Sequence, residues 1–533
     1  MSSRLLSLPT EILVDVLFRL PFQDLIACSW ACRRLRALVS DTPLLQYVAY
    51  AHRAGVADRF PPGLTVPDRF ATLQRWEAAW GRLDAMAPSG GSVVLRKRPH
   101  MKTTCMLRDG VLVAACFKDE PADEELAGYA AIDLLGRSGG GWAETQFAED
   151  VVALDVSVAQ NLVAMLHVRE LDGQNELLLD LLPFDDEGPG GHHIPDLGHI
   201  VADGPFSRRK VDLKIAGDFV AVMACGEAPG DMDSFTLVDW RAGSGNNVSE
   251  HVHLSAHLCE ANQVLSCPAN TYAPSFCFID HETVAHVRLR DNAIETRKIL
   301  VASDGEIYLR RFRRFDLPFA TTHDCRLLDA RWSGDHPCIT SPKSDRASRL
   351  PFQSRLESSV VALTLSYAAR GARDQRSFRA VIPRAKLLAG VWDTSSFRLF
   401  TLGCQAPACS SWTGGCSISG TRWINQCLQV FDFNAARVRG ALAWKRATTA
   451  TTTTATASPG LPNPIVHATD VPAAPGFERD VSSALPFCHT FPMNQFGDVY
   501  DGVLADDERV VAFRYKYNDD GLTMDVVFDV WTL

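Results

Sequence analysis

The chain has no long apolar run and no excess of positive charge, and these two absences exclude whole classes of protein. No uninterrupted hydrophobic stretch approaches the roughly 20 residues that a membrane-spanning helix requires. Lysine and arginine number 53 against 63 aspartates and glutamates, so the formal net charge is −10. Proteins that bind a phosphate backbone usually carry a basic surface that releases counterions. We therefore expect neither a membrane partner nor a nucleic-acid partner.

Motifs for catalysis and for cofactor binding are also missing. The sequence contains no GxSxG nucleophile elbow, no Walker loop and no flavin fingerprint. The glycine-rich segment 136–141 matches no phosphate-binding pattern and is expected to be a hairpin loop. The carboxylate pairs Asp185-Asp186 and Asp506-Asp507 lie in turn-rich segments, where we expect solvated side chains. The sequence therefore predicts no catalytic residue, no cofactor and no enzymatic activity.

Two groups of potential metal ligands have unsuitable spacing. His281 and His286 are five residues apart, which does not place them on one helical face. The cysteines at 404, 409, 416 and 427 lack the paired C-x-x-C arrangement that structural zinc sites usually use. We therefore expect no metal site.

Cysteine usage indicates a reducing compartment. The fifteen cysteines are odd in number and scattered along the whole chain, which is not a compact disulfide framework. The first residues are interrupted by proline and charged residues and do not form the apolar core of a signal peptide. We expect free thiols and a cytoplasmic or nuclear protein.

Apolar residues recur at helical spacing near the N-terminus. Pro9 suits the first turn of a helix, because its missing N–H would be unpaired there, and Pro21 ends that helix. The first apolar stripe consists of Ile12, Leu13, Val16, Leu17 and Leu20, and the second of Leu25, Cys28, Cys32, Leu35 and Leu38. Three short helices cannot bury this many large side chains among themselves, and exposed apolar patches usually mark interaction sites. The stripes therefore predict a partner, or packing of the helices as a cap on the rest of the chain.

The same stretch resembles an F-box. The residues that carry the resemblance are Leu8-Pro9-Thr10-Glu11-Ile12-Leu13, Leu20-Pro21, Asp24-Leu25, Cys32-Arg33-Arg34 and Leu44-Leu45. The family often has Trp at the position of Leu35 and a Leu-Trp pair at the position of Leu44-Leu45. The resemblance implies binding to a Skp-type adaptor and, through it, to a cullin-RING ligase.

The residues that we assign to this adaptor site are Leu8, Pro9, Glu11, Ile12, Leu13, Val16, Leu17, Leu20, Pro21, Leu25, Cys28 and Leu35. The sequence leaves open which of these contact the adaptor and which form the core of the helical module.

Beyond the helical module the residue pattern of the sequence changes. Residues 1–50 are expected to form the F-box module, and residues 51–87 a helical linker in which 67–83 forms a long helix. Short β-rich runs separated by turn residues fill 88–533, so this part is predicted to be all-β. A Thr-, Ala- and Pro-rich stretch at about 445–475 is expected to be a disordered insert.

A weak repeat runs through the β region. Asp109-Gly110, Gln160-Asn161 and Gly217-Asp218 each precede a strand-like run, and these runs start 51 and 57 residues apart. Further candidate units begin near residues 275, 358 and 420, and the last is a hairpin with alternating apolar residues from Arg509 onward. Repeats of this length with several strands each are typical of a β-propeller, here of about six or seven blades. A pair of β-sandwiches is the alternative fold.

The combination of an F-box with a divergent propeller-like region resembles many fungal F-box proteins. The resemblance implies the substrate-recognition subunit of an SCF-type ubiquitin ligase, with an unknown protein substrate held by the β domain. Two alternatives remain open: a scaffold that binds the adaptor without a role in ubiquitylation, and a propeller enzyme or lectin with an incidental helical cap.

Overall fold

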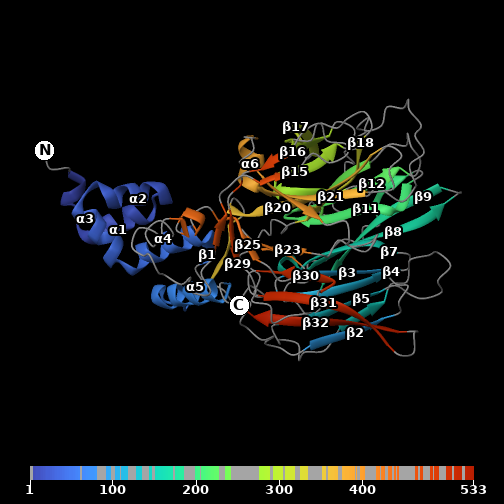
Figure 1. Ribbon diagram of the computed structural model, residues 1–533, viewed down its shortest axis with the longest axis horizontal. Helices are drawn as coiled ribbons and strands as arrows, with labels where there is room; N and C mark the ends of the chain where they lie inside the picture. Colours follow the sequence, from blue (N-terminus) through green and yellow to red (C-terminus); the bar gives the residue numbers. More distant parts are fainter. Residues whose placement is uncertain are drawn as a thin grey trace.

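A computed structural model shows a chain of helices at one end and a large β domain at the other (Figure 1). It describes residues 4–59, 63–80, 92–97, 102–108, 110–117, 128–134, 143–146, 151–171, 174–184, 199–203, 206–226, 234–241, 275–288, 292–303, 307–317, 325–333, 351–355, 358–369, 375–390, 392, 397–402, 416–419, 422–425, 430–434, 437–439, 441–442, 463–465, 469–471, 481–483, 485, 487–490, 500–506, 509–518 and 523–532.

Four α-helices follow a short 3-10 turn at Arg4–Ser7 and form the N-terminal module: α1 (Thr10–Phe18), α2 (Phe22–Ala31), α3 (Arg33–Asp41) and α4 (Pro43–Ala54). Proline sets three of these starts, because Pro9 and Pro21 are the N-cap residues of α1 and α2 and Pro43 is the first residue of α4. The predicted helices and the helix end before Pro21 are therefore present. The module's core is built on four buried leucines, which are Leu17, Leu25, Leu35 and Leu45.

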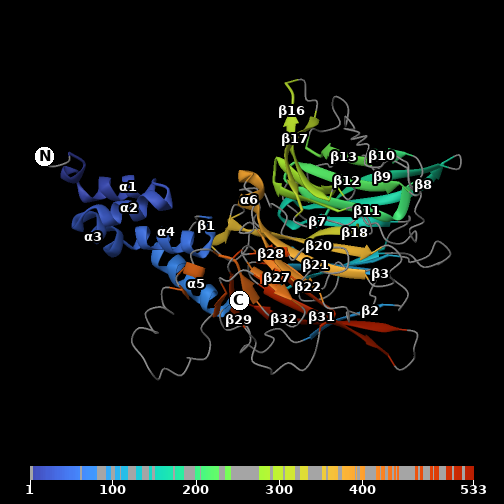
Figure 2. The ribbon, with the colours of Figure 1, turned by 45° about the horizontal axis from the view of Figure 1, so that its top comes forward.

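A short arm connects this module to the β domain. It begins with α4, which it shares with the module, and continues through strand β1 (Val56–Asp58) and helix α5 (Val66–Trp80); we call it the helical arm. Figure 2 shows the helices α1–α3 projecting away from the strands, with α4 and α5 between them and the β domain. Gly55 makes the turn from α4 into β1. Its φ of 76° is a left-handed conformation that residues with a side chain rarely adopt.

Within its described residues, the β domain contains seven successive antiparallel sheets of three to five strands, which we number as blades 1 to 7. Blade 1 consists of β3 (Lys102–Arg108), β4 (Val111–Phe117), β5 (Gly128–Asp133) and β6 (Ala143–Gln146), and blade 2 of β7 (Val151–Ser157), β8 (Leu162–Leu171), β9 (Gln174–Pro183) and β10 (His199–Asp203). Blade 3 consists of β11 (Phe206–Ala216), β12 (Phe219–Gly226) and β13 (Ser234–Asp239). Blade 4 consists of β14 (Phe276–Asp280), β15 (Thr283–Arg288), β16 (Ala293–Val301) and β17 (Ile307–Asp316).

Blade 5 consists of β18 (Cys325–Ser333), β20 (Val360–Ala369), β21 (Gln375–Pro383) and β22 (Arg398–Leu402). Blade 6 consists of β23 (Cys416–Ser419), β24 (Arg422–Asn425), β25 (Val430–Asp432), β29 (Phe487–Thr490) and β26 (Asn463–Ile465). Blade 7 consists of β30 (Gly502–Ala505), β31 (Arg509–Tyr517), β32 (Met524–Thr532) and β2 (Ser92–Lys97). Short elements between them are a 3-10 turn at Val158–Gln160, β19 (Phe352–Ser354), α6 (Arg384–Ala389), β27 (Thr469–Val471) and β28 (Val481–Ser483).

The blades form a closed ring. Each blade contacts the next through its first or second strand, and blade 7 contacts blade 1 through β30 and β3. The ring is locked by β2, which lies early in the chain but pairs with β32, so that Ser92 lies opposite Asp529. Radial repetition of such sheets in a closed ring is the architecture of a β-propeller. The β-propeller prediction is therefore confirmed, with seven blades among the described residues, and the β-sandwich alternative is wrong.

The repeat seen in the sequence is the turn that leads into the second strand of each early blade. The predicted starts Val111, Leu162 and Phe219 are the first residues of β4, β8 and β12. Gly110 and Asn161 have positive φ angles of 79° and 54° in these turns. Their carbonyl groups accept hydrogen bonds from residues just after the third strands, at 3.0 and 3.2 Å. The repeat is therefore a turn geometry that recurs from blade to blade.

The later repeat units are also present, but in different positions within their blades. The fourth unit is the first and second strands of blade 4, whereas the fifth is the second and third strands of blade 5. The terminal hairpin is β31 paired with β32. Its alternating residues Val511, Phe513, Val526, Phe528 and Val530 pack together against blade 1.

The prediction of a disordered insert at about 445–475 needs a correction. Strands β26 and β27 lie inside this interval, and β26 joins blade 6 by pairing with β29. The proline and threonine residues of this stretch made its strands hard to predict. Pro464 is tolerated because β26 is an edge strand of its sheet, where a missing N–H breaks no ladder hydrogen bond. Residues 445–462, 466–468 and 472–475 lie outside the described part of the chain.

Truncation of Phe528 tests the ring closure. Its side chain is fully buried between blades 7 and 1, with its ring 5.8 Å from that of Phe513. We expect Phe528→Ala to lower the free energy of unfolding by about 3 to 5 kcal/mol, measured by urea titration. Tyr517 lies on the same hairpin but is 67% exposed, so Tyr517→Ala should change this quantity by less than about 0.5 kcal/mol. Equal effects of the two substitutions would contradict the closure by β32.

Candidate functional site

The twelve residues assigned to the adaptor site differ sharply in burial. Four leucines are buried: Leu13, Leu17, Leu25 and Leu35. Leu8, Leu20 and Cys28 are half-buried, and Pro9, Glu11, Ile12, Val16 and Pro21 are exposed. The structure thus separates residues that hold the module together from residues available to a partner.

The exposed residues of α1 include an apolar pair. Ile12 is 50% exposed and Val16 is 36% exposed, and their spacing of four residues makes them neighbours on one helix face. Glu11 in the first turn of α1 places its negative charge at the favourable end of the helix dipole. This face, defined by Glu11, Ile12 and Val16, we call the α1 face.

Trp30 was missed by the sequence analysis. It lies at the end of α2 and is 74% exposed, the most exposed of the large hydrophobic residues in the described part of the chain. The apolar stripe of α2 contains Leu25 and Cys28, and Trp30 follows Cys28 by two residues, about 200° around the helix. Its position outside the stripe was the available signal, because a tryptophan on the polar side of a helix has no core to enter.

Arg34 fixes the chain that leads into α1. Its guanidinium group donates hydrogen bonds to the carbonyl oxygens of Leu6 and Leu8, the latter at 3.3 Å. These carbonyls lie just ahead of α1, so α3 holds the first residues of the module in place. Arg34 belongs to the Cys32-Arg33-Arg34 segment of the F-box pattern, and this contact is a physical reason for an arginine there.

Helix α4 belongs to two hydrophobic cores. Leu45 is fully buried among the leucines of the N-terminal module, whereas Tyr47 and Ala51 lie in a second core with α5 and blade 7. Val48 contacts both cores. A continuous helix that is packed in both places leaves little freedom for one part to move against the other.

The helical arm is attached to three consecutive blades. Strand β1 pairs with β19, a segment that lies between β18 and β20 of blade 5 in the sequence but outside their sheet. Trp76 of α5 packs its ring 5.1 Å from that of Phe352 in β19. Glu77 of α5 forms an ion pair with Arg437, which follows the strand β25 of blade 6. Trp531 of blade 7 is fully buried in the shared core.

A buried ion pair supports the arm from within. Arg69 of α5 contacts Asp58 of β1 at 2.6 Å, and its guanidinium group lies 5.6 Å from the centre of the Tyr47 ring. Burial, reinforced by the negative charge of Asp58, raises the pKa of Tyr47 well above its ordinary value. Tyr47 is therefore neutral and contributes its apolar ring to the core of the arm.

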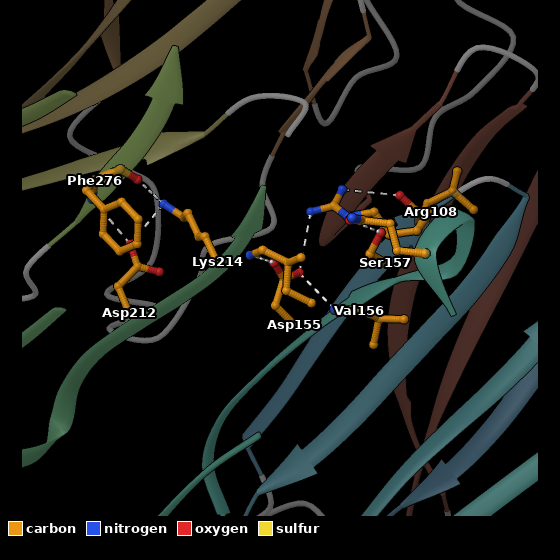
Figure 3. A network of polar contacts seen from close by, with 10 residues as sticks. Arg108, Asp155, Val156, Ser157, Asp212, Lys214 and Phe276 are labelled. Atoms are coloured by element: carbon orange, nitrogen blue, oxygen red, sulfur yellow. Dashed lines mark hydrogen bonds and ion pairs between the residues drawn. The ribbon is translucent and has the colours of Figure 1, made fainter. Parts of the chain in front are cut away.

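A polar network links the first strands of blades 1 to 4 (Figure 3). Asp155 of β7 accepts hydrogen bonds from the backbone N–H groups of Ile215 and Val156, at 2.8 and 3.0 Å. Arg108 of β3 approaches the same carboxylate at 3.9 Å. Burial raises the pKa of Asp155, while Arg108 and the two N–H donors oppose that shift.

The same network continues into blades 3 and 4. Lys214 of β11 forms an ion pair with Asp212 at 2.9 Å and lies 4.8 Å from the centre of the Phe276 ring of β14. The charges of Arg108, Asp155, Asp212 and Lys214 cancel. A balanced network whose carboxylates accept backbone N–H groups serves to hold neighbouring blades together, and we assign it a structural role.

A second charged cluster, on blade 4, is not balanced. Glu295 of β16 is fully buried and contacts Arg297 at 2.6 Å, Arg288 at 3.4 Å and Arg311 at 3.5 Å. Burial opposes ionisation of Glu295, but the surrounding positive charge, chiefly that of Arg297, holds its pKa below the usual value. Burial lowers the pKa of the neighbouring His286 to about 4, so this histidine is neutral at pH 7. Three guanidinium groups thus surround a single carboxylate.

The other residues considered as metal ligands, catalytic carboxylates or a phosphate-binding loop do not come together in the described structure. His281 is exposed in the turn before β15, whereas His286 is buried within that strand. Asp506, expected to be solvated, instead accepts a hydrogen bond at 2.9 Å from the N–H of Gly110 in blade 1. Segment 136–141, Asp185-Asp186 and the cysteines 404, 409 and 427 lie outside the described residues.

The described ranges contain neither a metal-binding cluster nor a membrane-spanning helix. There, no three histidine, cysteine, aspartate or glutamate side chains gather closely enough to hold a metal ion. No described helix combines the length and the apolar composition that crossing a membrane requires.

Comparison with known families identifies the N-terminal module. Residues 5–48 match the family model described as F-box-like, so the chain carries an F-box-like domain. This agrees with the resemblance read from the sequence, and F-box domains generally bind Skp-type adaptors of cullin-RING ligases. No curated protein matches the chain.

Solved structures resemble the β domain only distantly. Hsv2 from Kluyveromyces marxianus is 10% identical, with 81% of this chain and 99% of that chain covered and a TM-score of 0.29. The WD40 domain of SCAP from fission yeast is 8% identical, with coverage of 82% and 98% and a TM-score of 0.29. Hsv2 from Kluyveromyces lactis is 14% identical, with 40% of this chain and 61% of that chain covered and a TM-score of 0.23, so this chain spans about three fifths of that protein. At these TM-scores the propeller assignment rests on the strand pairing described above.

The buried His286 makes stability depend on pH. Its pKa is about 4 in the folded chain and about 6.5 in an unfolded one, so between these values only the unfolded chain binds the proton. The free energy of unfolding should therefore fall as the pH is lowered through this window, by about 2 kcal/mol between pH 7.5 and pH 5 from this group. We expect His286→Gln to show a smaller loss in urea titrations at pH 7.5 and pH 5. An identical loss in the variant would show that the histidine is not responsible.

Proposed function

We propose that this chain is the substrate-recognition subunit of an SCF-type cullin-RING ubiquitin ligase. In this role the α1 face and Trp30 bind a Skp-type adaptor, and the propeller binds a protein substrate. The chain itself acts as a receptor, and the transfer of ubiquitin is carried out by other subunits.

The observation that carries the proposal is the apolar α1 face on a module whose core is already complete. Leu17, Leu25 and Leu35 satisfy the packing of the three short helices, yet Ile12 and Val16 remain in water. Complete burial of an exposed aliphatic side chain contributes roughly 1.5 to 3 kcal/mol, so covering the 50% of Ile12 and the 36% of Val16 that are exposed contributes roughly 0.5 to 1.5 kcal/mol for each residue. A second surface therefore provides the natural partner for these residues, and the F-box-like match indicates an adaptor as that surface.

The double packing of α4 supports the receptor role. A ligase accelerates transfer by holding the substrate near the conjugating enzyme, which raises its effective concentration. This effect is largest when the connection has little freedom, because a loose linker spreads the substrate over a larger volume. The helical arm, packed in two cores and attached to three blades, is a connection of the required stiffness.

Substitution of the α1 face tests the adaptor site. We expect Ile12→Asp with Val16→Asp to reduce capture by a purified Skp-type adaptor at least tenfold, because two charges enter the proposed apolar contact. Leu64→Asp with Leu182→Asp is the matched control, since both leucines are 41% exposed and lie outside the F-box-like domain. Circular dichroism checks that both variants are folded.

Retained capture by the folded Ile12 and Val16 variant would contradict the site. Leu13 is unsuitable for this purpose, because its side chain is only 1% exposed and its truncation costs about 2 to 5 kcal/mol of stability. Trp30→Asp, made separately, measures the contribution of the end of α2.

A second experiment distinguishes a receptor from a scaffold. The full-length chain is captured from cells in which the proteasome is stalled, alongside the Ile12→Asp and Val16→Asp variant. For a receptor, proteins bound to the propeller carry ubiquitin in the wild-type sample and lose it in the variant sample, while their binding persists. Equal ubiquitylation in the two samples would support the scaffold function instead.

A further inference from the structure

We propose that the outer edge of blade 4 binds an acidic segment of a protein partner by adding it as a strand beside β17. The proposal deepens the proposed function, because it names the chemical class of substrate that the propeller recognises. The positively charged residues of this blade are Arg288, Arg297, Lys298, Arg310, Arg311, Arg313 and Arg314, and we call the exposed ones on β17, which are Arg310, Arg311 and Arg314, the basic edge.

The basic edge runs against the overall charge of the chain. The whole protein carries a formal charge of −10, yet the described residues of blade 4 contain seven lysines and arginines against four aspartates and glutamates. Four of the seven lie on β17 alone, which has a single acidic residue, Asp316. The concentration of positive charge is therefore a local property of this blade.

The carboxylates of the described residues do not neutralise this charge. Glu295 is shared by three arginines, and Lys298 and Arg314 have the partners Glu282 at 3.6 Å and Asp316 at 3.1 Å. Arg310 forms no ion pair among the described residues, and Arg311 keeps 52% of its side chain exposed, whereas the guanidinium group of Arg313 packs against Gly390 at the end of α6. The balanced network of the inner strands shows the contrast, because there each positive group has its own carboxylate.

The position of β17 leaves its backbone open to a new strand. The sheet order is β14, β15, β16 and β17, and β17 pairs only with β16 among the described strands. Such an edge presents a row of N–H and C=O groups that an extended peptide can bind. The ten residues of β17 offer an edge roughly 33 Å long.

Aromatic side chains lie among these charges. Phe312 has Arg313 4.6 Å and Lys298 5.5 Å from its ring centre, so its face is occupied by cations. Tyr308 is 42% exposed on the same strand. Tyr308 thus offers apolar contact beside the guanidinium groups, which suits a peptide with alternating acidic and apolar residues.

Edge charges also protect a sheet from pairing with a second copy of the same protein. The register of β17 shifts between Arg311 and Arg313, and such an irregularity has the same protective effect. Protection and recognition are compatible, because arginines that repel an identical edge attract an acidic one. A long nucleic acid is disfavoured as the occupant, since the acidic remainder of the chain would repel its phosphates.

Fluorescence anisotropy of the full-length chain tests the basic edge. The probe is a labelled ten-residue peptide in which glutamate alternates with valine, and the comparison peptide has glutamine in place of glutamate. We expect the glutamate peptide to bind at least tenfold more tightly, and its affinity to fall with added salt. Arg310→Glu with Arg314→Glu should weaken its binding at least tenfold.

The matched control is Arg75→Glu with Lys516→Glu, which makes the same change in net charge at exposed positions of α5 and blade 7. Its affinity for the glutamate peptide should stay within twofold of the wild-type value. Amide hydrogen exchange should slow in residues 307–316 when the peptide binds, because their outward N–H groups become hydrogen-bonded.

Three results would overturn the proposal: an equal loss of affinity in the control variant, equal binding of the glutamine peptide, or unchanged exchange in β17. Tighter binding of a single-stranded RNA of equal charge would replace the acidic peptide by a nucleic acid. Adaptor capture is measured on the same samples, and the Ile12→Asp and Val16→Asp variant should lose it while keeping the peptide. Failure at the basic edge is thereby distinguished from failure of the adaptor site.

Discussion

The packing of the β31–β32 hairpin on both of its faces is the constraint on which the rest of the molecule depends. Val511, Phe513 and Phe528 point toward blade 1 and close the ring. Val510 and Trp531, which alternate with them, point the other way and pack on the helical arm. Because successive side chains of a strand face opposite sides, one hairpin joins the two ends of the ring and also anchors the helices. A shift of one residue in this hairpin would exchange the two faces and disrupt both.

The helical arm carries this constraint from the ring to the N-terminal module. Tyr47 and Trp76 lie in the core that blade 7 completes, and Leu45, two residues before Tyr47, lies in the core of the module. The α1 face is therefore held in a defined position relative to the propeller. This arrangement supports the proposed receptor, whose substrate has to be presented at a constant distance from the adaptor.

The charged residues of the blades form two kinds of cluster, a neutral network that joins neighbouring blades and a cluster with surplus positive charge on blade 4. Arg108, Asp155 and Lys214 belong to a network whose charges cancel and whose carboxylates accept backbone N–H groups, so it stabilises contacts between blades. Around Glu295 the positive groups outnumber the negative ones, and Arg311 extends this surplus to the outside of the propeller. A surplus at an open sheet edge is the physical basis for the proposed acidic partner.

The sequence by itself determined the local elements, because periods of 3.6 and 2 and the turn before Val111 depend only on nearby residues. It also determined the presence of the F-box-like domain. The tertiary structure alone decided that Leu13 is buried while Ile12 beside it is exposed, because both satisfy the same helical spacing. It likewise decided the pairing of Ser92 with Asp529 and the gathering of arginines around Glu295. Contacts between residues far apart in the chain depend on closure of the ring, and no local pattern contains that information.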